Sequence, residues 1–347
     1  MNTMKFQKLA TLALLLTSIA YIGCDSGTQA TQVQDIVEMK WQSDGSALFG
    51  FMQSYTETAT STIPGIGYSI AKFNSDGSLS QTFNTPPLGR TDFTNSLFVS
   101  ADGSTAVTEL DYDLYRYNFK SGVLEKLQTL FHLILVSPDL HYAIGSPSPA
   151  SQPIKTLQVY DLTSSPIRLV THFDIAGLSS SCGVWLNNST FGVTVNEIDS
   201  VGTHISIFDT ASTGVPLKVI GGAEVQFHNF VFNSQTNDLF IRDHAGKSSD
   251  YFVDDVNLTT NSRTTILNFK VENFDITKDK QVIIYSTYDT TNTLLFKSRN
   301  LSTLNENTVS TDIRLIISLS PAEDKLAYIR QRDANYTEVR VIPFSRP

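Results

Sequence analysis

KFNSDG, at residues 72–77, is the first of six segments that share one pattern along most of the chain. In each segment a bulky strand residue precedes an Asn or Asp, and a polar turn follows. The other five are RYNFKSG (116–122), VYDLTSS (159–165), IFDTASTG (207–214), DVNLTTN (255–261) and SRNLSTL (298–304). The Asn or Asp positions are Asn74, Asn118, Asp161, Asp209, Asn257 and Asn300, in steps of 44, 43, 48, 48 and 43 residues. A period of about 40–45 residues with several short strands per repeat is typical of propeller blades.

A second series of turns lies half a repeat ahead of the first. Its members are mostly Asp-Gly, Pro-Asp and Asn-rich pairs, which favour tight turns because they tolerate or preset the backbone angles that such turns need. They are Ser43-Asp44-Gly45, Asp102-Gly103, Pro138-Asp139, Asn187-Asn188, Asn233-Ser234, Lys278-Asp279 and Glu323-Asp324. Each repeat therefore predicts an inner pair of strands around this turn and an outer pair around the Asn or Asp turn.

Seven inner turns and six outer turns predict an all-β fold, a seven-bladed β-propeller with four-stranded antiparallel blades. The last repeat lacks its outermost strand, because the seventh outer turn would fall near Phe344 and the sequence stops at Pro347. We expect residues 30–35 to close the last blade as an N-terminal strand, since closure removes an exposed sheet edge. Eight blades would require a further repeat, and six would leave the last repeat outside the ring.

The last repeat also resembles a known family. Its sequence, LSPAEDKLAYIRQRDANYTEVRVI (319–342), is similar to the PD40 (WD40-like) repeat of TolB-type propellers. The matching positions are Ser320, Pro321, Lys325, Leu326, Ala327, Arg332, Asp333 and Asn335. The resemblance covers the repeats of roughly residues 35–343 and implies a propeller. It implies little about activity, because propellers carry out both binding and catalysis.

The N-terminal segment resembles the signal peptide of bacterial lipoproteins. Lys5 and Lys8 precede an apolar run over residues 9–22, and Gly23 stands directly before Cys24. The resemblance implies removal of residues 1–23 and acylation of Cys24, with residues 24–34 as a short tether and residues 35–347 as the propeller. The alternative is an ordinary signal peptide cut near Ala20. A spanning helix is disfavoured because the apolar run is shorter than about 18–20 residues.

The charge of the chain limits its partners. Without Lys5 and Lys8, 23 of the 25 basic residues remain against 34 acidic ones, a net charge of −11. An acidic surface argues against nucleic acid, whose binding needs clustered Lys and Arg. We therefore expect contact with a membrane, inner or outer and on either side of it, through the lipid alone. Cys182 would have no disulfide partner, and a buried thiol is favoured over a nucleophile because it lies in an apolar strand.

The irregular segments of the repeats predict where a binding site lies. The connections between second and third strands differ in length, with long ones at 54–67, 146–155, 196–203 and 243–250, and binding residues often lie on such loops. The candidate binding-face residues are Glu109, Asp111, Asp113, Arg242, Asp243, His244, Arg330, Arg332 and Asp333. The alternative for each is a solvated loop charge. His132 and His228 begin inner strands, where a structural hydrogen bond is favoured over metal ligation.

No segment predicts a catalytic residue, a cofactor or a metal. Gly246-Lys247-Ser248 lacks the upstream glycine of a phosphate loop, and no HExxH or GxSxG motif occurs. We therefore expect a monomeric, non-enzymatic, lipid-anchored platform outside the cytoplasm that binds an envelope protein or extracellular ligand. The alternatives are a lactonase- or lyase-like propeller enzyme with a metal or acid–base site on the loop face, and a structural adhesin.

Overall fold

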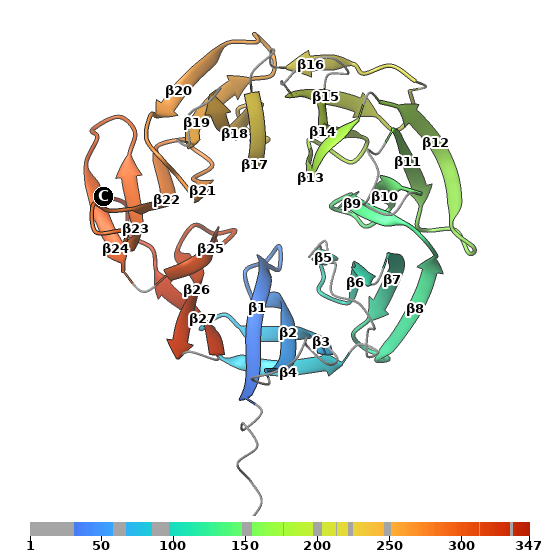
Figure 1. The fold of residues 1–347 in the computed structure, drawn as a ribbon, viewed down its shortest axis with the longest axis horizontal. Coiled ribbons are helices and arrows are strands. Elements are labelled where there is room, and N and C mark those ends of the chain that lie inside the picture. The colour runs from blue at the N-terminus through green and yellow to red at the C-terminus, as the bar shows by residue number, and fades with distance from the viewer. Residues whose placement is uncertain are drawn as a thin grey trace, which may run out of the picture.

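The described part of the chain forms a ring of β-sheets around an open centre (Figure 1). The computed structural model describes residues 31–57, 67–84, 97–110, 112–147, 155–175, 177–196, 203–212, 214–220, 225–245, 251–311, 313–333 and 336–347. All the regular elements in these ranges are strands, and they form seven blades. The predicted all-β, seven-bladed propeller is confirmed.

Blades 1 to 3 each contain four strands in sequence order. Blade 1 contains β1 (Thr31–Trp41), β2 (Ala47–Glu57), β3 (Gly67–Asn74) and β4 (Leu79–Asn84). Blade 2 contains β5 (Leu97–Val99), β6 (Thr105–Leu110), β7 (Asp113–Asn118) and β8 (Val123–Gln128). Blade 3 contains β9 (His132–Val136), β10 (Tyr142–Ser146), β11 (Thr156–Asp161) and β12 (Arg168–Asp174). The first strand of each blade lines the centre and the fourth forms the outer wall (Figure 1).

Blades 4 to 6 repeat this order, and blade 7 has three strands of its own. Blade 4 contains β13 (Leu178–Trp185), β14 (Thr190–Asn196), β15 (Thr203–Asp209) and β16 (Lys218–Ile220). Blade 5 contains β17 (Val225–Asn233), β18 (Asp238–Ala245), β19 (Tyr251–Asn257) and β20 (Arg263–Leu267). Blade 6 contains β21 (Asn273–Ile276), β22 (Val282–Tyr288), β23 (Leu294–Asn300) and β24 (Glu306–Ser310). Blade 7 contains β25 (Ile313–Leu319), β26 (Lys325–Asp333) and β27 (Tyr336–Pro343).

Both predicted series of turns join the strands that they were expected to join. The seven inner turns connect first to second strands, and each of the six Asn or Asp positions ends a third strand. The reason is local: the Asn118 side-chain oxygen accepts the backbone N–H groups of Lys120 at 3.0 Å and Ser121 at 2.9 Å. Asn300 makes the same pair of bonds in blade 6. Such a side chain fixes the turn by bonding the backbone that follows it.

Strand β1 closes the ring, as predicted, but by a different pairing. Gln34 of β1 pairs with Tyr336 of β27 in parallel, and the Ile36 N–H donates to the Thr337 hydroxyl at 2.7 Å. The same strand pairs with β2 along its whole length, so seven strands form one continuous sheet. The pairing is parallel because β1 is a first strand and β27 a third strand, and in antiparallel blades these run in the same direction. A bulge between Ile36 and Glu38 bends β1 where it meets both blades.

Apolar side chains fill the spaces between neighbouring blades. Successive side chains of a strand point to opposite faces, so each strand supplies two interfaces. In β21, Phe274 and Ile276 pack with Phe240 and Val253 of blade 5, while the Asp275 carboxylate accepts the Leu319 N–H of blade 7. Burial of each such apolar side chain contributes about 1.5–3 kcal/mol. The ring therefore depends on every pair of neighbouring blades.

Several predicted features lie outside the described residues. They include residues 1–30 with Cys24, and Asp111. Cys182 lies in β13, but its side chain is also outside the description. The signal peptide, the lipid anchor and the buried thiol stay predictions. Within the described ranges, no helix is long and apolar enough to cross a membrane.

Candidate functional site

The candidate residues lie where second strands end and third strands begin, in three blades. In blade 2, Glu109 lies near the end of β6 and Asp113 begins β7. In blade 5, β18 carries Arg242, Asp243 and His244, and in blade 7, β26 carries Arg330, Arg332 and Asp333. The side chains of Asp243, His244 and Asp333 are outside the description, although their backbones pair within the sheets. The candidates therefore occupy three separate places around the ring.

Glu109 is buried and joins blade 2 to blade 3. Its carboxylate accepts the backbone N–H of Leu133 at 2.6 Å, and the His132 Nδ1 lies 3.4 Å away. Both side chains are almost inaccessible. A buried carboxylate needs such partners, because removing a charge from water is costly. Glu109 therefore stabilises the contact between β6 of blade 2 and β9 of blade 3. The structural hydrogen bond expected of His132 stays a prediction, because its Nδ1 has no hydrogen-bond partner among the described atoms.

Asp113 is engaged within its own blade. Its carboxylate forms an ion pair with Lys126 of β8 and accepts the N–H of Leu130 at 3.1 Å. The hydrogen bond that Lys126 donates to the Asp113 carboxylate raises the pKa of Lys126. Because Lys126 is largely exposed, the pair contributes little to stability. Asp113 orders the end of the outer hairpin.

Arg242 belongs to a polar cluster at the boundary between blades 5 and 6. Its guanidinium donates to the backbone carbonyl of Glu272 and lies 3.8 Å from the Glu272 carboxylate. Lys270 Nζ lies 3.1 Å from the same carboxylate and 5.3 Å from the centre of the Tyr288 ring. Tyr288 is 41% exposed. We name Arg242, Lys270, Glu272 and Tyr288 the blade 5–6 cluster.

The sequence did not indicate Lys270, Glu272 and Tyr288. Lys270 and Glu272 lie in the link between β20 and β21, and Tyr288 is the last residue of β22. The useful signal was an aromatic residue at the same strand end as Arg242, next to a charged link between blades. Their meeting depends on how blade 6 packs against blade 5.

Blade 7 presents a second cation with an aromatic ring. The guanidinium carbon of Arg332 lies 4.7 Å from the centre of the Tyr336 ring, and Arg332 is exposed. Arg330 forms an ion pair with Glu338 of β27, which also accepts from Arg340 at 2.9 Å. A cation over an aromatic face is attracted by the ring quadrupole by about 0.5–1 kcal/mol when exposed. Arg332 and Tyr336 thus resemble the Lys270–Tyr288 pair in chemistry.

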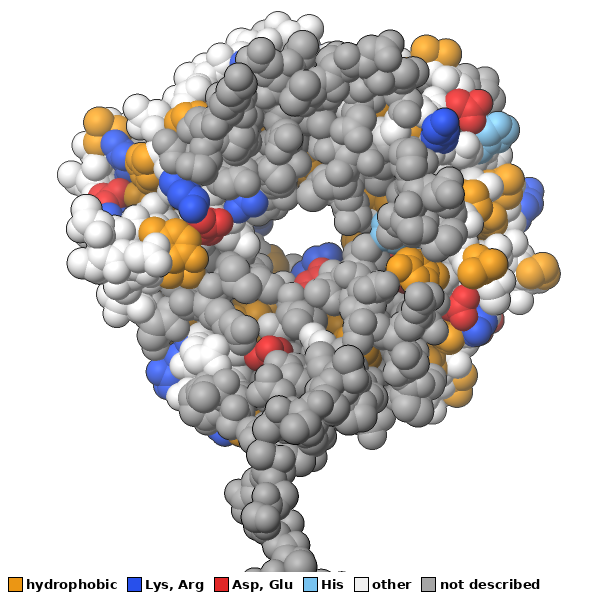
Figure 2. All heavy atoms as spheres, in the orientation of Figure 1, with side chains coloured by type: hydrophobic (Ala, Val, Ile, Leu, Met, Phe, Trp, Pro, Cys, Tyr) orange, Lys and Arg blue, Asp and Glu red, His pale blue; other side chains and the backbone are white. Residues whose placement is uncertain are grey.

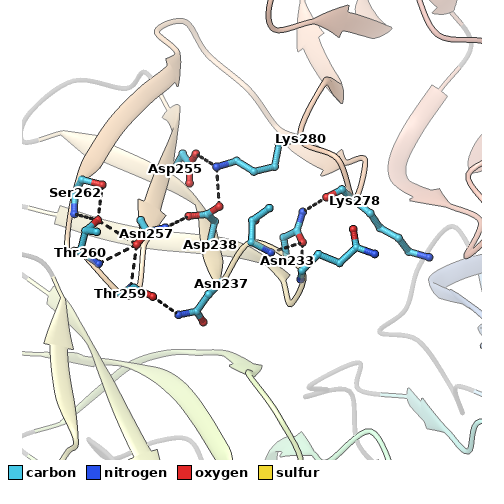
Figure 3. Close-up of polar contacts among 12 residues, drawn as sticks. Asn233, Asn237, Asp238, Asp255, Asn257, Thr259, Thr260, Ser262, Lys278 and Lys280 are labelled. Atoms are coloured by element: carbon cyan, nitrogen blue, oxygen red, sulfur yellow. Dashed lines mark hydrogen bonds and ion pairs between the residues drawn. The ribbon is translucent and has the colours of Figure 1, made fainter.

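The opposite face, formed by the inner and outer turns, is bonded mostly to itself. Figure 3 shows Lys280, from the inner turn of blade 6, between Asp238 and Asp255 of blade 5, at 2.7 and 2.6 Å. Burial alone would raise the pKa of Asp238, but Lys280 and Asn257 outweigh it and lower that pKa. Burial raises the pKa of Asp255, because Lys280 offsets only part of the cost. Lys280 therefore ties blade 6 to two carboxylates of blade 5.

Two grooves on the turn face lie between blades 2, 3 and 4. In one of them His141 stacks on Tyr142 with ring centres 4.3 Å apart, beside Asn187 and Asn188. The other contains Arg116, which donates to the carbonyl of Leu162 in the next blade. Over the described ranges, no three His, Cys, Asp or Glu side chains gather as a metal site would require.

Figure 2 shows that the ring is open along its axis, with acidic and basic side chains on the wall of the opening. Lys40 and Glu38 of β1 lie 3.0 Å apart, and Lys40 Nζ lies 4.2 Å from the centre of the Phe98 ring in blade 2. The Glu38 carboxylate also accepts the Leu97 N–H at 2.6 Å. The charged side chains of β1 therefore contact blade 2 and help to hold blades 1 and 2 together.

The comparisons with solved structures show the fold. The chain is similar to the β-propeller domain of the Trilobed protease from Pyrococcus furiosus, at 11% identity and a TM-score of 0.64, over 90% of this chain and 94% of that one. It is also similar to an oligogalacturonate lyase in complex with manganese, at 10% identity and a TM-score of 0.63, over 91% of both chains. No protein-family model matches the chain, and no curated protein does.

The propeller fold that the resemblance implied is confirmed by the arrangement of the strands. TolB from Acinetobacter baumannii aligns at 10% identity and a TM-score of 0.48, over 82% of this chain and 75% of that one. A score of this size carries no argument about function. The chain is therefore a seven-bladed β-propeller, and its activity has to be inferred from its own residues.

Proposed function

We propose that this protein is an exported, lipid-anchored β-propeller that binds an envelope protein or extracellular ligand without catalysing a reaction. The binding face is the one that carries the connections between second and third strands. The observation that carries the proposal is two cation–aromatic pairs near this face, Lys270 with Tyr288 and Arg332 with Tyr336. In each pair one member, Tyr288 or Arg332, is exposed and the other is half-buried. Tyr and Arg are enriched among the residues that dominate binding energy.

The two faces of the ring differ in a way that supports this choice. The connections on the binding face run from two residues, 334–335 after β26, to nine residues, 58–66 after β2. The inner turns on the other face are short and alike. Loops of unequal length on a rigid scaffold are where binding residues usually lie. The contacts between blades, such as those of Glu109 and Lys280, keep that scaffold rigid.

The test is affinity capture from solubilised envelope with the full chain as bait. We expect a protein or ligand recovered with the wild type to be lost with Tyr288→Ala and with Arg332→Ala. The matched control is Lys120→Ala, an exposed residue in the outer turn of blade 2 on the opposite face, which should leave capture unchanged. Equal recovery with all four baits would contradict the proposed face.

A second measurement separates binding from catalysis. Elemental analysis of the purified chain tests the alternative of a lactonase- or lyase-like enzyme. Tightly bound calcium or zinc at one ion per chain would favour that alternative, because such enzymes use a metal to polarise the substrate or activate water.

The lipid anchor has its own test. Cys24→Ser should move the protein from the membrane fraction to the soluble exported fraction, and mass spectrometry of the wild-type N-terminus should find acyl chains on Cys24. An unmodified N-terminus near residue 21 would favour the ordinary signal peptide and remove the anchor from the proposal.

A further inference from the structure

The left-handed residues of the turn face follow from the turns in which they lie. In the inner turns, Leu140 of blade 3 occupies the place that Gly45 and Gly103 have in blades 1 and 2, and each donates its N–H three residues back. In the outer turns, Leu304 of blade 6 corresponds to Gly122 of blade 2 in the same way. The turn type sets a left-handed backbone at these places, so by itself it does not indicate a function.

Two bulky left-handed residues lie side by side on the proposed binding face, in blade 2. Tyr112 lies in the connection between β6 and β7 with φ +60°, and Leu130 lies in the link from β8 to β9 with φ +52°. The Phe131 N–H donates to the Tyr112 carbonyl at 2.6 Å, which joins the two segments. In the described part of this face the other left-handed residue that is not glycine is Asn292, and asparagine tolerates this conformation.

Neither the backbone nor the packing of the fold favours a leucine at position 130. In the left-handed conformation the Cβ of leucine crowds the following carbonyl oxygen, which glycine avoids entirely. The Leu130 side chain gains little burial in return, because it is 66% exposed. Glycine or asparagine would therefore suit the fold better here. Strained residues that persist cluster at binding and active sites, and Leu130 lies on the face proposed to bind.

The backbone around Leu130 is held firmly on both sides. The Leu130 N–H donates to the Asp113 carboxylate at 3.1 Å, and the next N–H, of Phe131, donates to Tyr112. The Phe131 ring is buried and packs edge-on against the Tyr160 ring of blade 3, with ring centres 5.3 Å apart. The exposed leucine is thus ordered before it binds, so binding loses little conformational entropy.

We propose that Leu130 is a preformed anchor of the binding face, which enters an apolar pocket of a partner protein with the half-buried Tyr112 beside it. The inference rests on the proposed binding function and narrows its partner to a protein. Small molecules bind in concave sites that enclose most of their surface, whereas Leu130 projects from a link between strands. A projecting side chain has to enter a pocket of the partner, and such anchors dominate the binding energy of protein interfaces.

Affinity capture from solubilised envelope, with the full chain as bait at limiting concentration, tests the anchor. Leu130→Gly and Leu130→Asn should each reduce recovery of the partner protein at least about tenfold, because one leucine side chain is no longer buried in the complex. Leu130→Met should keep recovery close to that of the wild type, since methionine is apolar and of similar volume.

The matched control is Leu304→Gly, because Leu304 is also left-handed and 60% exposed but lies on the turn face. It should leave recovery unchanged. The melting temperatures of Leu130→Gly and Leu304→Gly should agree within about 2 °C, since the two residues have the same backbone conformation and similar exposure. A clearly lower melting temperature for Leu130→Gly would show that Leu130 stabilises the fold, and would overturn its role as an anchor.

The remaining outcomes separate this inference from the proposed function. Unchanged recovery with Leu130→Gly would overturn the anchor, and loss of recovery with Tyr288→Ala in the same experiment would leave the proposed binding face standing. Recovery of no protein with the wild type would overturn both. A small ligand lost with Leu130→Gly would overturn a protein as the occupant. Binding of the Cys24→Ser chain to phosphatidylcholine vesicles, lost on adding Leu130→Gly, would overturn it in favour of a membrane surface.

Discussion

The boundary between blades 7 and 1 is built differently from the boundary between blades 5 and 6. Blades 5 and 6 are both complete four-stranded sheets, packed through Phe240 and Phe274 and tied by Lys280. Blade 7 has three strands, and its edge β27 meets β1 in parallel. The outer turn of blade 1 also reaches β27, where Gly77 lies against Val339 and Val341.

The difference shows that ring closure relies on packing more than on sheet hydrogen bonds. Between blades 7 and 1, Ile36 and Met39 of β1 form one buried cluster with Ile329 and Val339 of blade 7. At the blade 5–6 boundary, a buried polar contact adds to the apolar core. The first boundary should therefore be most sensitive to loss of apolar contact, and the second to loss of charge.

Deletion of residues 28–36 should have the largest effect. It removes Ile36 and the part of β1 that pairs with β27, so the edge strand of blade 7 loses its neighbour. Blade 1 loses about half of the pairing between β1 and β2. We expect the free energy of unfolding to fall by more than about 4 kcal/mol, since truncating one buried isoleucine alone costs about 2–5 kcal/mol. Urea denaturation measures this loss. Unfolding at the wild-type urea concentration would show that β1 does not close the ring.

Lys280→Met should be next in size, at the other boundary. It leaves Asp238, which is buried, and Asp255 without their shared cation. We expect the free energy of unfolding, measured by chemical denaturation, to fall by about 3 kcal/mol. This is the lower end of the cost of breaking a buried ion pair, because Lys280 is partly exposed. Lys126→Met, at an exposed pair, should cost less than about 1 kcal/mol. Equal losses of stability in the two variants would contradict a stabilising contact of Lys280 with Asp238 and Asp255 between blades 5 and 6.

Gly77→Ala should cost about 2 kcal/mol at the boundary between blades 7 and 1. Gly77 has φ +87°, and a Cβ there would lie 3.2 Å from the Val339 carbonyl oxygen and from a Val341 methyl. Gly214→Ala is the matched control, because Gly214 has φ +81° and its Cβ would meet nothing within 4 Å among the described atoms. In the control, the free energy of unfolding should fall only by the cost of holding alanine in the left-handed conformation, about 1 kcal/mol. Thermal unfolding that ranks the two variants equally would exclude close contact at Gly77.

A pH dependence of stability is expected at the boundary between blades 6 and 7. Burial raises the pKa of Asp275 to about 6. The folded state therefore holds this proton more tightly than the unfolded state, and stability falls as pH rises from about 4 to 6. Asp275→Asn should remove this pH dependence, which amounts to about 3 kcal/mol across the window, while its side-chain oxygen still accepts the Leu319 N–H.

Equilibrium unfolding measured across this pH window tests the assignment. An unchanged slope in the Asp275→Asn variant would contradict it. Asp76 gives a control of opposite sign, because hydrogen bonds from Ser78 lower the pKa of Asp76. Its stabilisation is present above the usual aspartate pKa and is lost as pH falls, so Asp76→Asn should not remove the Asp275 slope.

The repeat of turns could be predicted from the sequence because each turn is stabilised locally. The Asn118 and Asn300 side chains bond the backbone two and three residues later, whatever the rest of the ring does. The closing strand was found because residues 30–35 were left over by the repeat. Its parallel direction was missed, since the prediction treated it as an added fourth strand and not as the first strand of blade 1.

The candidate site was harder to predict because a charged residue at a strand end can either bond the neighbouring blade or face solvent and bind a partner. Glu109 was predicted to lie on the binding face because of its position in the strand, yet its carboxylate accepts a backbone N–H of the neighbouring blade. Tyr288 was not predicted as a binding residue, yet it lies exposed beside Lys270. A single sequence shows which residue ends a strand, but not which side chain the adjacent blade covers.

The sequence by itself determined the number of blades, the position of each tight turn and the acidic character of the chain. These follow from short-range backbone chemistry and from composition. Only the tertiary structure decided the partners of Glu109 and Lys280, the direction of the closing pair and the exposure of Tyr288. The reason is that each depends on which face of a strand meets the next blade, and that contact joins residues far apart in the sequence.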